Sequence, residues 1–360
     1  MTGRLTRDAG PDRSRRRLVA ALAALAAGGA LAPLALAEPA PRSAAAPRRI
    51  DVHHHIIPPP YVAAQRARIL AGADIPDPTA LLHWTPAAAL EAMDRSGVAT
   101  AITSISTPGI WFGDVAAARA LARACNDYAA GMARDHPGRF GLFACVPLPD
   151  PEGSLAEIDY AFGTLKADGI GLLTSYGDKW PGDPAFAPVF DELNRRKAVV
   201  YVHPTAPGCC TSLIPGIPAS MTEFLFDTTR AVTSLLVNGT FARCPDIRFI
   251  FAHASGTLAV LAGRIDGFFK RHKEYAAQVP GGVLPALRRL HFDIASQVNP
   301  PAMAALLKLV PVSQILFGSD FPYVPIPATA VPFDAFDLAA PDKRAIDRGN
   351  ALRLFPRLSA

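Results

Sequence analysis

Four segments of the chain resemble β-strands and end in histidine or aspartate, the residue types that bind divalent metals and transfer protons. The first segment, 48–55, ends in three consecutive histidines. Because side chains two residues apart on a strand share a face, we expect His53 and His55 to lie side by side and His54 to face elsewhere. The other three segments end, in chain order, in His203, His253 and Asp320. This pattern predicts a catalytic metal site.

The ligand types suit a single catalytic ion. Such an ion takes three or four nitrogen or oxygen ligands and keeps one position open for water or substrate. The predicted ligands are His53, His55, His203 and Asp320. Three neutral imidazoles and one carboxylate leave a divalent site with a net charge of about +1, which attracts a carboxylate or phenolate. We expect one ion rather than two, because the strand-like segment 169–175 ends in Thr174-Ser175 and the nearest lysine, Lys179, follows in a loop.

His253 supplies a further titratable group at the end of a strand-like segment. An imidazole whose pKa is near neutrality can donate or accept a proton, so we predict an acid/base role for His253, alongside Asp320. A fifth metal ligand is the alternative role for His253. Any one of these histidines could be an ordinary buried residue, but their shared position at strand ends favours chemistry for all except His54.

Other polar and aromatic residues near strand ends are weaker candidates. Asp293 shares a strand face with His291 and is predicted to orient a metal ligand. The remaining candidates for the substrate pocket are Tyr176, Trp180, Glu223, Arg230 and Phe321. For Arg230, an ion pair with Asp227 three residues earlier on a helix is the default interpretation.

Short apolar, β-branched segments alternate with helical segments along the chain. The expected strands lie near 48–55, 98–106, 140–148, 169–175, 199–204, 247–253, 291–295 and 315–320. The expected helices lie near 86–96, 115–135, 153–166, 184–196, 222–243, 255–271, 300–309 and 341–355. Eight alternations favour an α/β fold of the (β/α)8 TIM-barrel type, because every candidate residue then lies at the carboxyl-end rim.

An open doubly wound sheet is the alternative fold, but the glycine-rich dinucleotide motif is absent after the first strand. The segments 56–85 and 205–221 are expected to be long loops. Loops of this length at the catalytic rim commonly shape a substrate pocket.

Residues 1–37 have the composition of an export signal. The segment 14–19 resembles a twin-arginine motif, 18–37 is uncharged, and Ala35-Leu36-Ala37 fits a cleavage site. We expect a twin-arginine signal peptide at 1–37, recognised by the twin-arginine export machinery, a disordered linker at 38–47 and one catalytic barrel at 48–360. The mature chain is then periplasmic, extracellular or in the cell envelope, or anchored in the membrane if the leader is not cleaved.

The net charge resides mainly in that leader. The whole chain carries +5, and six arginines minus two aspartates give +4 within 1–37, which leaves +1 for the rest. The basic balance is therefore no argument for nucleic-acid binding, and we expect no nucleic-acid partner. Five sparse cysteines without CxxC spacing predict neither a disulfide framework nor a cysteine-bound zinc.

With these residues in place, the chain resembles the amidohydrolase superfamily, in the branch of the aminocarboxymuconate semialdehyde decarboxylases. The similar motifs include 51–55 (DVHHH), 201–204 (YVHP), 251–258 (FAHASGTL), 316–322 (LFGSDFP) and 349–351 (GNA). The similarity is greatest to the 6-methylsalicylate decarboxylases, through 50–61, 107–109, 165–169 and 202–205. The γ-resorcylate decarboxylases begin with Glu-x-His, where this chain has His53-His54-His55.

The resemblance implies non-oxidative decarboxylation of a small hydroxylated aromatic acid of the salicylate type, or of a related unsaturated carboxylic acid. The phenol oxygen and the carboxylate would chelate one divalent ion, zinc or alternatively manganese, and Asp320 or His253 would protonate the ring carbon that loses carbon dioxide. Hydrolysis of an ester, lactone or amide by metal-bound hydroxide is the alternative reaction, since the same ligands serve both. A homodimer is compatible with the sequence.

Overall fold

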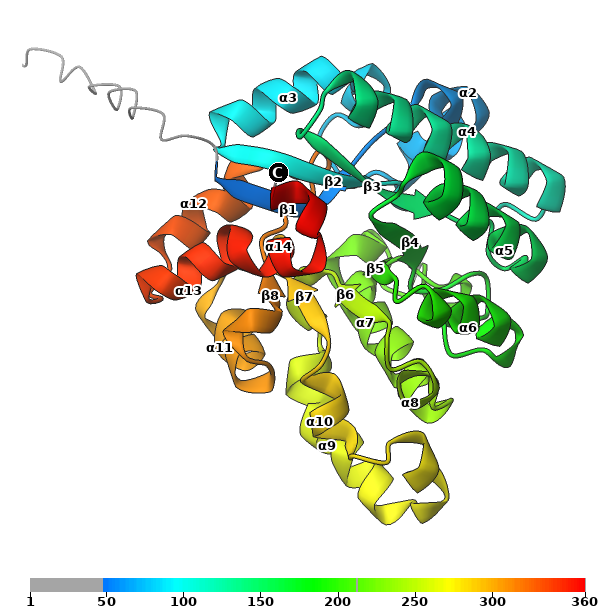
Figure 1. Cartoon of the computed structure of the whole chain (residues 1–360), viewed down its shortest axis with the longest axis vertical. Coiled ribbons are helices and arrows are strands. Elements are labelled where there is room, and N and C mark those ends of the chain that lie inside the picture. The colour runs from blue at the N-terminus through cyan, green and yellow to red at the C-terminus, as the bar shows by residue number, and fades with distance from the viewer. Residues whose placement is uncertain (1–47, 212, 360) are drawn as a thin grey trace, which may run out of the picture. The chain divides into compact units, whose positions relative to one another are not determined.

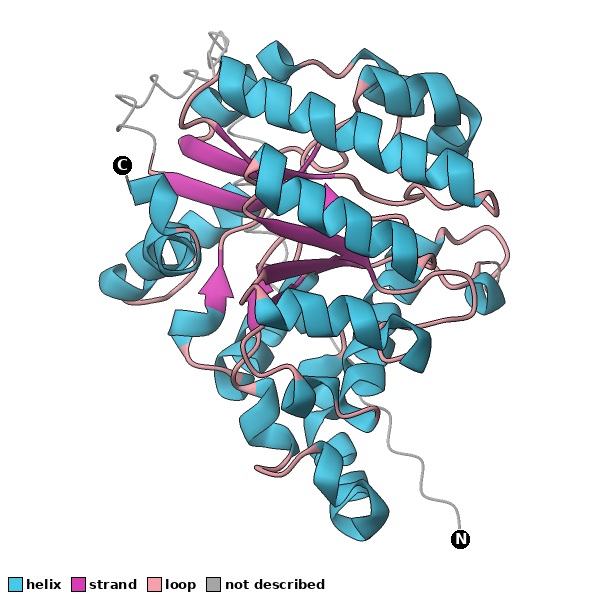
Figure 2. Cartoon of the chain, turned by 45° about the vertical axis from the view of Figure 1, so that its right-hand side comes forward, coloured by secondary structure: helices cyan, strands magenta, loops and turns pink. Residues whose placement is uncertain are grey.

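A computed structural model describes residues 48–211 and 213–359 of the chain. The described part is a (β/α)8 barrel, in which eight parallel strands follow one another around the sheet in chain order. Helices cover the outside of the strands (Figures 1 and 2). The predicted signal peptide and linker, 1–47, lie outside the described residues.

All eight expected strands are present, several of them shorter than predicted. They are β1 (Arg49–His55), β2 (Val98–Ser104), β3 (Phe140–Cys145), β4 (Gly169–Leu173), β5 (Val199–His203), β6 (Arg248–Phe251), β7 (His291–Asp293) and β8 (Ile315–Leu316). The barrel closes between β1 and the segment after β8. There, Val52 N donates to Phe317 O at 3.0 Å and Asp320 N donates to His53 O at 2.8 Å. This closure brings Asp320 directly beside the histidines of β1.

The α-helices connect the strands, and several of them begin at a side-chain cap or with an early proline. They are α2 (Pro59–Gly72), α3 (Pro86–Arg95), α4 (Val115–Asp135), α5 (Pro151–Tyr160), α6 (Ala187–Arg195), α7 (Ala219–Val237), α8 (Thr240–Arg243), α9 (Leu258–Arg271), α10 (Val283–Leu287), α11 (Pro300–Leu309), α12 (Pro327–Ala335), α13 (Ala340–Arg344) and α14 (Asn350–Leu354). At α3, for example, the Thr85 side chain accepts a hydrogen bond from Ala88 N, with Pro86 in the first turn.

Several connections differ from the sequence-based expectation. The segment 56–85 is not a loop throughout, because Pro59 begins helix α2; proline fits the first helical turn, where its missing N–H has no partner to lose. The single helix expected at 222–243 is divided into α7 and α8 at Gly239, whose φ of +75° belongs to the left-handed region. Helices α10 and α12 had no counterpart in the prediction.

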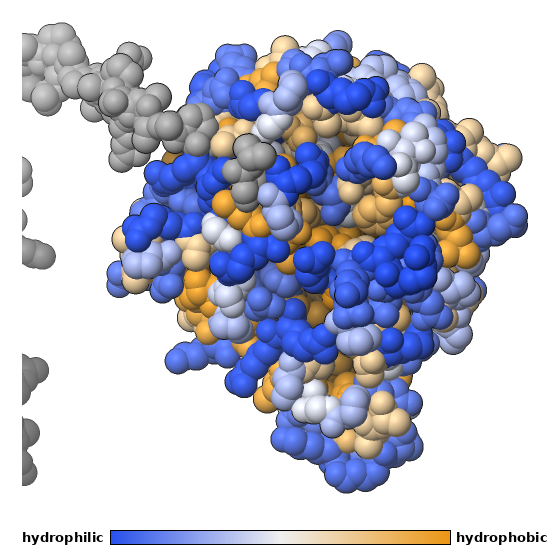
Figure 3. All heavy atoms as spheres, viewed as in Figure 1, coloured by the Kyte–Doolittle hydropathy of each residue, from blue (hydrophilic) through white to orange (hydrophobic). Residues whose placement is uncertain are grey.

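Apolar side chains fill both the barrel interior and the layer between the strands and the helices. The interior cluster includes Val52, Phe143 and Tyr201, and Phe355 from the C-terminal segment packs against it. The ring of Phe143 stacks on that of Tyr201 with centroids 5.1 Å apart. In Figure 3, hydrophilic side chains cover most of the visible face of the barrel, and hydrophobic ones show mainly in the seams between them. No helix among the described residues is long and apolar enough to cross a membrane.

The cysteines agree with the absence of a disulfide framework. Cys209 forms a disulfide with its neighbour Cys210, which closes no long loop. The other three, Cys125, Cys145 and Cys244, are buried free thiols.

Candidate metal centre

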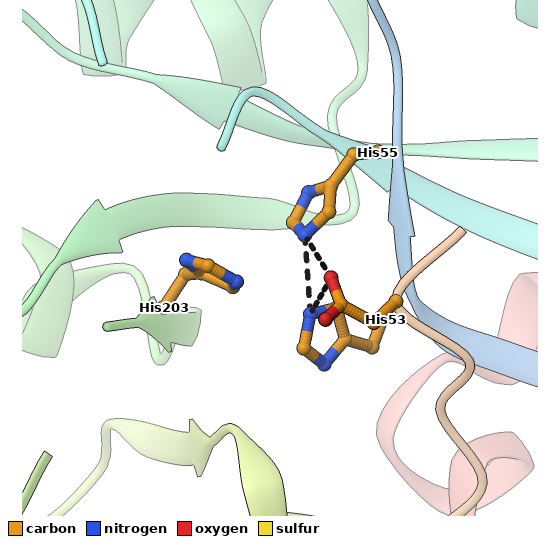
Figure 4. Close-up of side chains that lie close together, drawn as sticks. His53, His55 and His203 are labelled. Carbon is orange, nitrogen blue, oxygen red and sulfur yellow. Dashed lines mark hydrogen bonds and ion pairs between the residues drawn. The ribbon is translucent and has the colours of Figure 1, made fainter. Parts of the chain in front are cut away.

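Four side chains converge at the carboxyl end of the barrel. His53 and His55 come from β1, His203 from the end of β5, and Asp320 follows β8. One ligand atom from each lies within 4.8 Å of the others. Asp320 Oδ1 is 3.2 Å from the Nε2 atoms of both His53 and His55. The three imidazole rings surround one common space (Figure 4).

The outer ring nitrogens of these histidines are already engaged. His53 Nδ1 is 3.0 Å from Asp293 Oδ2, His55 Nδ1 is 3.0 Å from Ser104 Oγ, and the contact from His203 Nδ1 to Ser106 Oγ is longer, at 3.5 Å. Hydrogen bonds of this kind set the tautomer and leave the Nε2 lone pair for a metal.

The inner nitrogens of His53 and His55 contact each other and share Asp320 Oδ1 as a partner. His53 Nε2 and His55 Nε2 lie 3.1 Å apart, and a hydrogen bond between them could satisfy only one of the two lone pairs. His203 Nε2 is buried and has no hydrogen-bond partner among the residues that the structure describes. Three convergent imidazole nitrogens and one carboxylate oxygen match the ligands of a catalytic divalent ion, and such an ion would satisfy the buried His203 nitrogen. The donor set therefore fits a divalent metal.

Electrostatics distinguishes the three histidines in the absence of an ion. Burial by itself lowers the pKa of His53, but the carboxylates of Asp293 and Asp320 outweigh burial and raise it to about 10. Burial lowers the pKa of His55 to about 4 and that of His203 well below its usual value. Burial raises the pKa of Asp320, but the charge of His53 outweighs burial and holds that pKa well below its usual value. The metal-free site thus holds one imidazolium between two carboxylates.

His253 lies beside the four, with its ring turned toward Asp320. Its Nδ1 is 3.0 Å from the carbonyl oxygen of Ala295, and its Nε2 is 3.9 Å from Asp320 Oδ2. His253 and Asp320 both adopt the left-handed backbone region, with φ of +57° and +71°. Non-glycine residues seldom adopt this conformation unless surrounding contacts impose it, and such residues cluster at functional sites.

His54 faces away from the site, as the alternation of side chains predicts. Its Nδ1 lies 3.1 Å from Asp51 Oδ2, and its ring stacks on Phe321 with centroids 4.8 Å apart. Asp51 also accepts hydrogen bonds from the backbone N–H groups of His53 and Ser319, both at 3.0 Å. The pair of Asp51 and His54 therefore links β1 to the segment that carries Asp320.

A cavity of about 350 Å³ is lined by two of the four side chains, His203 and Asp320, and by His253. Its walls come from the ends of β2 and β5, the start of α7 and the segments after β7 and β8. The residues that line it are Gly72, Asp74, Ser106, Thr107, His203, Pro218, Ser220, Met221, Phe224, Leu225, His253, Ser296, Gln297, Asp320, Tyr323 and Val324. A larger cavity of about 600 Å³ lies among α8, α10 and the start of β6, but no histidine, aspartate or glutamate lines it. The chemistry therefore belongs to the smaller cavity.

The weaker pocket candidates lie elsewhere than in this cavity. The Tyr176 hydroxyl accepts a hydrogen bond from Leu173 N at 2.9 Å, so it stabilises its own loop. Trp180 Nε1 donates to Asp227 Oδ1 at 2.7 Å. The Tyr176 ring lies against Phe186 with centroids 6.0 Å apart, and the Trp180 indole is bound to α7 through Asp227.

Glu223 and Arg230 form an ion pair with each other at 3.3 Å, and Arg230 also approaches Asp227 at 3.8 Å, as the default interpretation predicts. Phe321 packs on His54 on the far side of β1 from the metal ligands. Neither Glu223, Arg230 nor Phe321 lines the cavity. Glu223 and Arg230 lie on α7, on the helix where the sequence placed them, but their side chains contact each other and not the cavity.

Asp293 contacts a predicted ligand directly through His53 Nδ1. Two residues that the sequence reasoning overlooked have a similar position, namely Ser104 and Ser106 at the end of β2. The sequence pattern could have identified Ser104 and Ser106. They lie two residues apart at a strand end, as His53 and His55 do, and residues with this spacing share a face.

Comparison with known proteins agrees with this architecture. The family model described as amidohydrolase matches residues 50–357. The chain is 38% identical over 331 residues to the decarboxylase YanB of Aspergillus niger, an alignment that covers 86% of this chain and 88% of that protein. It is 37% identical over 317 residues to the 6-methylsalicylic acid decarboxylase of Penicillium expansum, covering 86% of this chain and 97% of that protein.

The fold is also similar to that of solved structures. A crystal structure described as amidohydrolase II superimposes with a TM-score of 0.78 at 28% sequence identity, covering 87% of this chain and 100% of the other. The match to the family model and the relatives above 30% identity both span most of the chain. They confirm the resemblance that the motifs indicated, and the chain belongs to the amidohydrolase family.

Proposed function

We propose that this protein is a metal-dependent decarboxylase of small hydroxylated aromatic acids of the salicylate type. The observation that carries the proposal is the geometry of Asp320. Its Oδ1 faces the Nε2 atoms of His53 and His55, while its Oδ2 faces His253 Nε2. One oxygen of this carboxylate can thus bind the metal while the other transfers a proton. The relatives at 37–38% identity are both named decarboxylases.

The cavity has no cationic side chain to hold a substrate carboxylate. None of its lining residues is lysine or arginine, so the positive charge must come from the metal centre. His53, His55, His203 and Asp320 would hold a divalent ion there. When bound, such an ion neutralises the charge of a chelating phenol oxygen and carboxylate and so stabilises the transition state.

The chain's own chemistry in this reaction is proton delivery. The bond between the ring carbon and the carboxylate breaks, carbon dioxide leaves, and one proton takes its place on the ring carbon. Asp320 Oδ2 and His253 Nε2, 3.9 Å apart, are the two groups positioned to carry that proton. The bond from His253 Nδ1 to the Ala295 carbonyl keeps the His253 ring oriented so that Nε2 faces the site.

The test is carbon dioxide release from a panel of salicylates, with ring opening of lactones and ester hydrolysis as the competing reactions. An acid/base group contributes roughly 10²- to 10⁴-fold in rate, so we expect Asp320→Asn and His253→Asn to lose turnover by that factor while the fold is retained. Release of carbon dioxide at the wild-type rate by metal-loaded Asp320→Asn, or turnover of lactones alone, would contradict the proposal.

We propose zinc as the resident ion, with manganese as the alternative, and export of the chain by the twin-arginine machinery with removal of residues 1–37. Nitrogen-rich ligand sets favour zinc. Metal analysis of the purified protein and the N-terminal sequence of the mature chain are the two measurements that decide these points. A mature chain that retains residues 1–37 in the cytoplasm would contradict export.

A further inference from the structure

The cavity above the metal centre carries an uneven distribution of charge. Two of its lining residues are carboxylates, Asp74 and Asp320, and none is lysine or arginine. Asp320 belongs to the metal centre. Asp74 is exposed and lies in the segment that follows α2. The second carboxylate therefore stands at the solvent end of the cavity, where no cation among the lining residues balances it.

A hydrogen bond holds Asp74 in this position. Ser220 Oγ donates to Asp74 Oδ2 at 2.5 Å, and Ser220 lies in the first turn of α7. Both residues line the cavity, so the bonded pair joins the segment after α2 to α7 across its wall. Met221 in the same turn as Ser220, and Phe224 and Leu225 in the next turn of α7, also line the cavity.

The remaining wall gives a substrate ring little polar recognition. Phe224, Leu225 and Val324 offer apolar contact, and the polar groups are chiefly hydroxyls and the amide of Gln297. In the proposed function, a divalent ion held by the four side chains would take up one carboxylate and an adjacent phenol oxygen. A second carboxylate on the ring would point away from the metal, into a cavity whose only other formal charge among the lining residues is the negative charge of Asp74.

We propose that Asp74 is a specificity-determining residue that restricts the enzyme to monocarboxylic hydroxybenzoates by repelling a second carboxylate. This inference rests on the proposed decarboxylase function. Like charges that approach within several ångströms near a protein surface disfavour binding, and a neutral methyl substituent at the same ring position avoids that cost. Asp74 acts on the substrate substituent and takes no part in the chemical step.

The experiment compares kcat/KM for salicylates that carry either a methyl group or a carboxylate at the same ring position, at the 4- and 5-positions in turn. In the wild type we expect the methyl-substituted acid to be preferred at both positions. In Asp74→Asn we expect kcat/KM for the carboxy-substituted acid to rise about tenfold, with the methyl-substituted acid changed less than about twofold. Asp74→Lys should raise the value for the dicarboxylate further.

Two control variants separate charge from structure. Asp337→Asn removes the same charge from an exposed site that does not line the cavity, and we expect no change in preference. Ser220→Ala keeps the carboxylate but removes the hydrogen bond that positions it, so the preference should fall by less than in Asp74→Asn. Equal changes for both substrates in Asp74→Asn and Ser220→Ala would show a structural role and overturn the proposal.

The two proposals fail in different ways. If neither acid releases carbon dioxide, the decarboxylase function itself is wrong. If the methyl-substituted acid is decarboxylated but the wild type prefers the dicarboxylate, or Asp74→Asn leaves the preference unchanged, the assignment of Asp74 is wrong while the function stands.

Discussion

Replacing Asp293 by asparagine is expected to weaken metal binding, although Asp293 is not one of the four predicted ligands. Asp293 Oδ2 lies 3.0 Å from His53 Nδ1, and Oδ1 accepts hydrogen bonds from the backbone N–H groups of His253 at 3.1 Å and Ala295 at 3.0 Å. One buried carboxylate therefore orients the predicted metal ligand His53 and stabilises the left-handed backbone of His253, the predicted acid/base group.

Asparagine has the same shape but only one acceptor oxygen. If its amide NH2 group faces His53, Nδ1 must accept, and the ring proton moves to Nε2, where it blocks the metal. If the NH2 group faces the backbone instead, the N–H groups of His253 and Ala295 lose their acceptor. Loss of an outer partner of a metal ligand costs 10- to 100-fold in affinity, so we expect the Kd for the ion to rise by that factor, or about 1.4–2.8 kcal/mol.

The assay is competition for zinc, and separately for manganese, against a chromophoric chelator, with circular dichroism as a check of the fold. Tyr201→Phe is the matched control, because the Tyr201 hydroxyl donates to the same Oδ2 at 3.4 Å but belongs to a residue outside the predicted ligand set. We expect the Kd of this control to change less than about threefold. Wild-type affinity in folded Asp293→Asn would refute the argument that Asp293 determines the state of His53.

Two further predictions follow from the structure. Metal uptake should release about one proton per chain between roughly pH 6 and 9. The raised pKa of His53, about 10, keeps that ring protonated in the metal-free site. The lowered pKa values of His55 and His203 leave those two rings neutral. Titration calorimetry in buffers of different ionisation enthalpy measures this release, which should decrease as the pH rises through the pKa of His53, about 10. No release at pH 7 would contradict it. Asp227→Ala should lower the free energy of unfolding by about 3 kcal/mol. The substitution leaves the Trp180 indole N–H and the hydroxyl groups of Thr174 and Ser175 without their acceptor. Urea denaturation measures this loss, and a change below about 1 kcal/mol would show that water replaces the carboxylate.

Much of the metal centre could be predicted because strand geometry is local. The two-residue period of a strand was enough to pair His53 with His55 and to exclude His54, and parallel strands bring their carboxyl ends to one rim. The same reasoning could have found Ser104 and Ser106. The functional roles of these residues stay predictions, as does the assignment of residues 1–47.

The substrate pocket could not be predicted in this way. Tyr176 and Trp180 follow a strand end as the prediction required, yet their polar groups pair with Leu173 N and Asp227. In a loop, the direction of a side chain depends on which buried donors and acceptors need a partner, and those belong to distant segments. The contact between Asp74 and Ser220, 146 residues apart, is of the same kind.

The amino-acid sequence by itself determined the order of strands and helices, the rim at which the histidines meet and the family, because periodicity and motifs are properties of short segments. Only the tertiary structure decided which oxygen of Asp320 faces His253 and which nitrogen of each histidine faces the predicted metal position. It also placed the carboxylate of Asp74 at the solvent end of the cavity. These depend on atoms brought together from residues far apart in the chain, whose positions are set by the closure of the barrel and the packing of its loops.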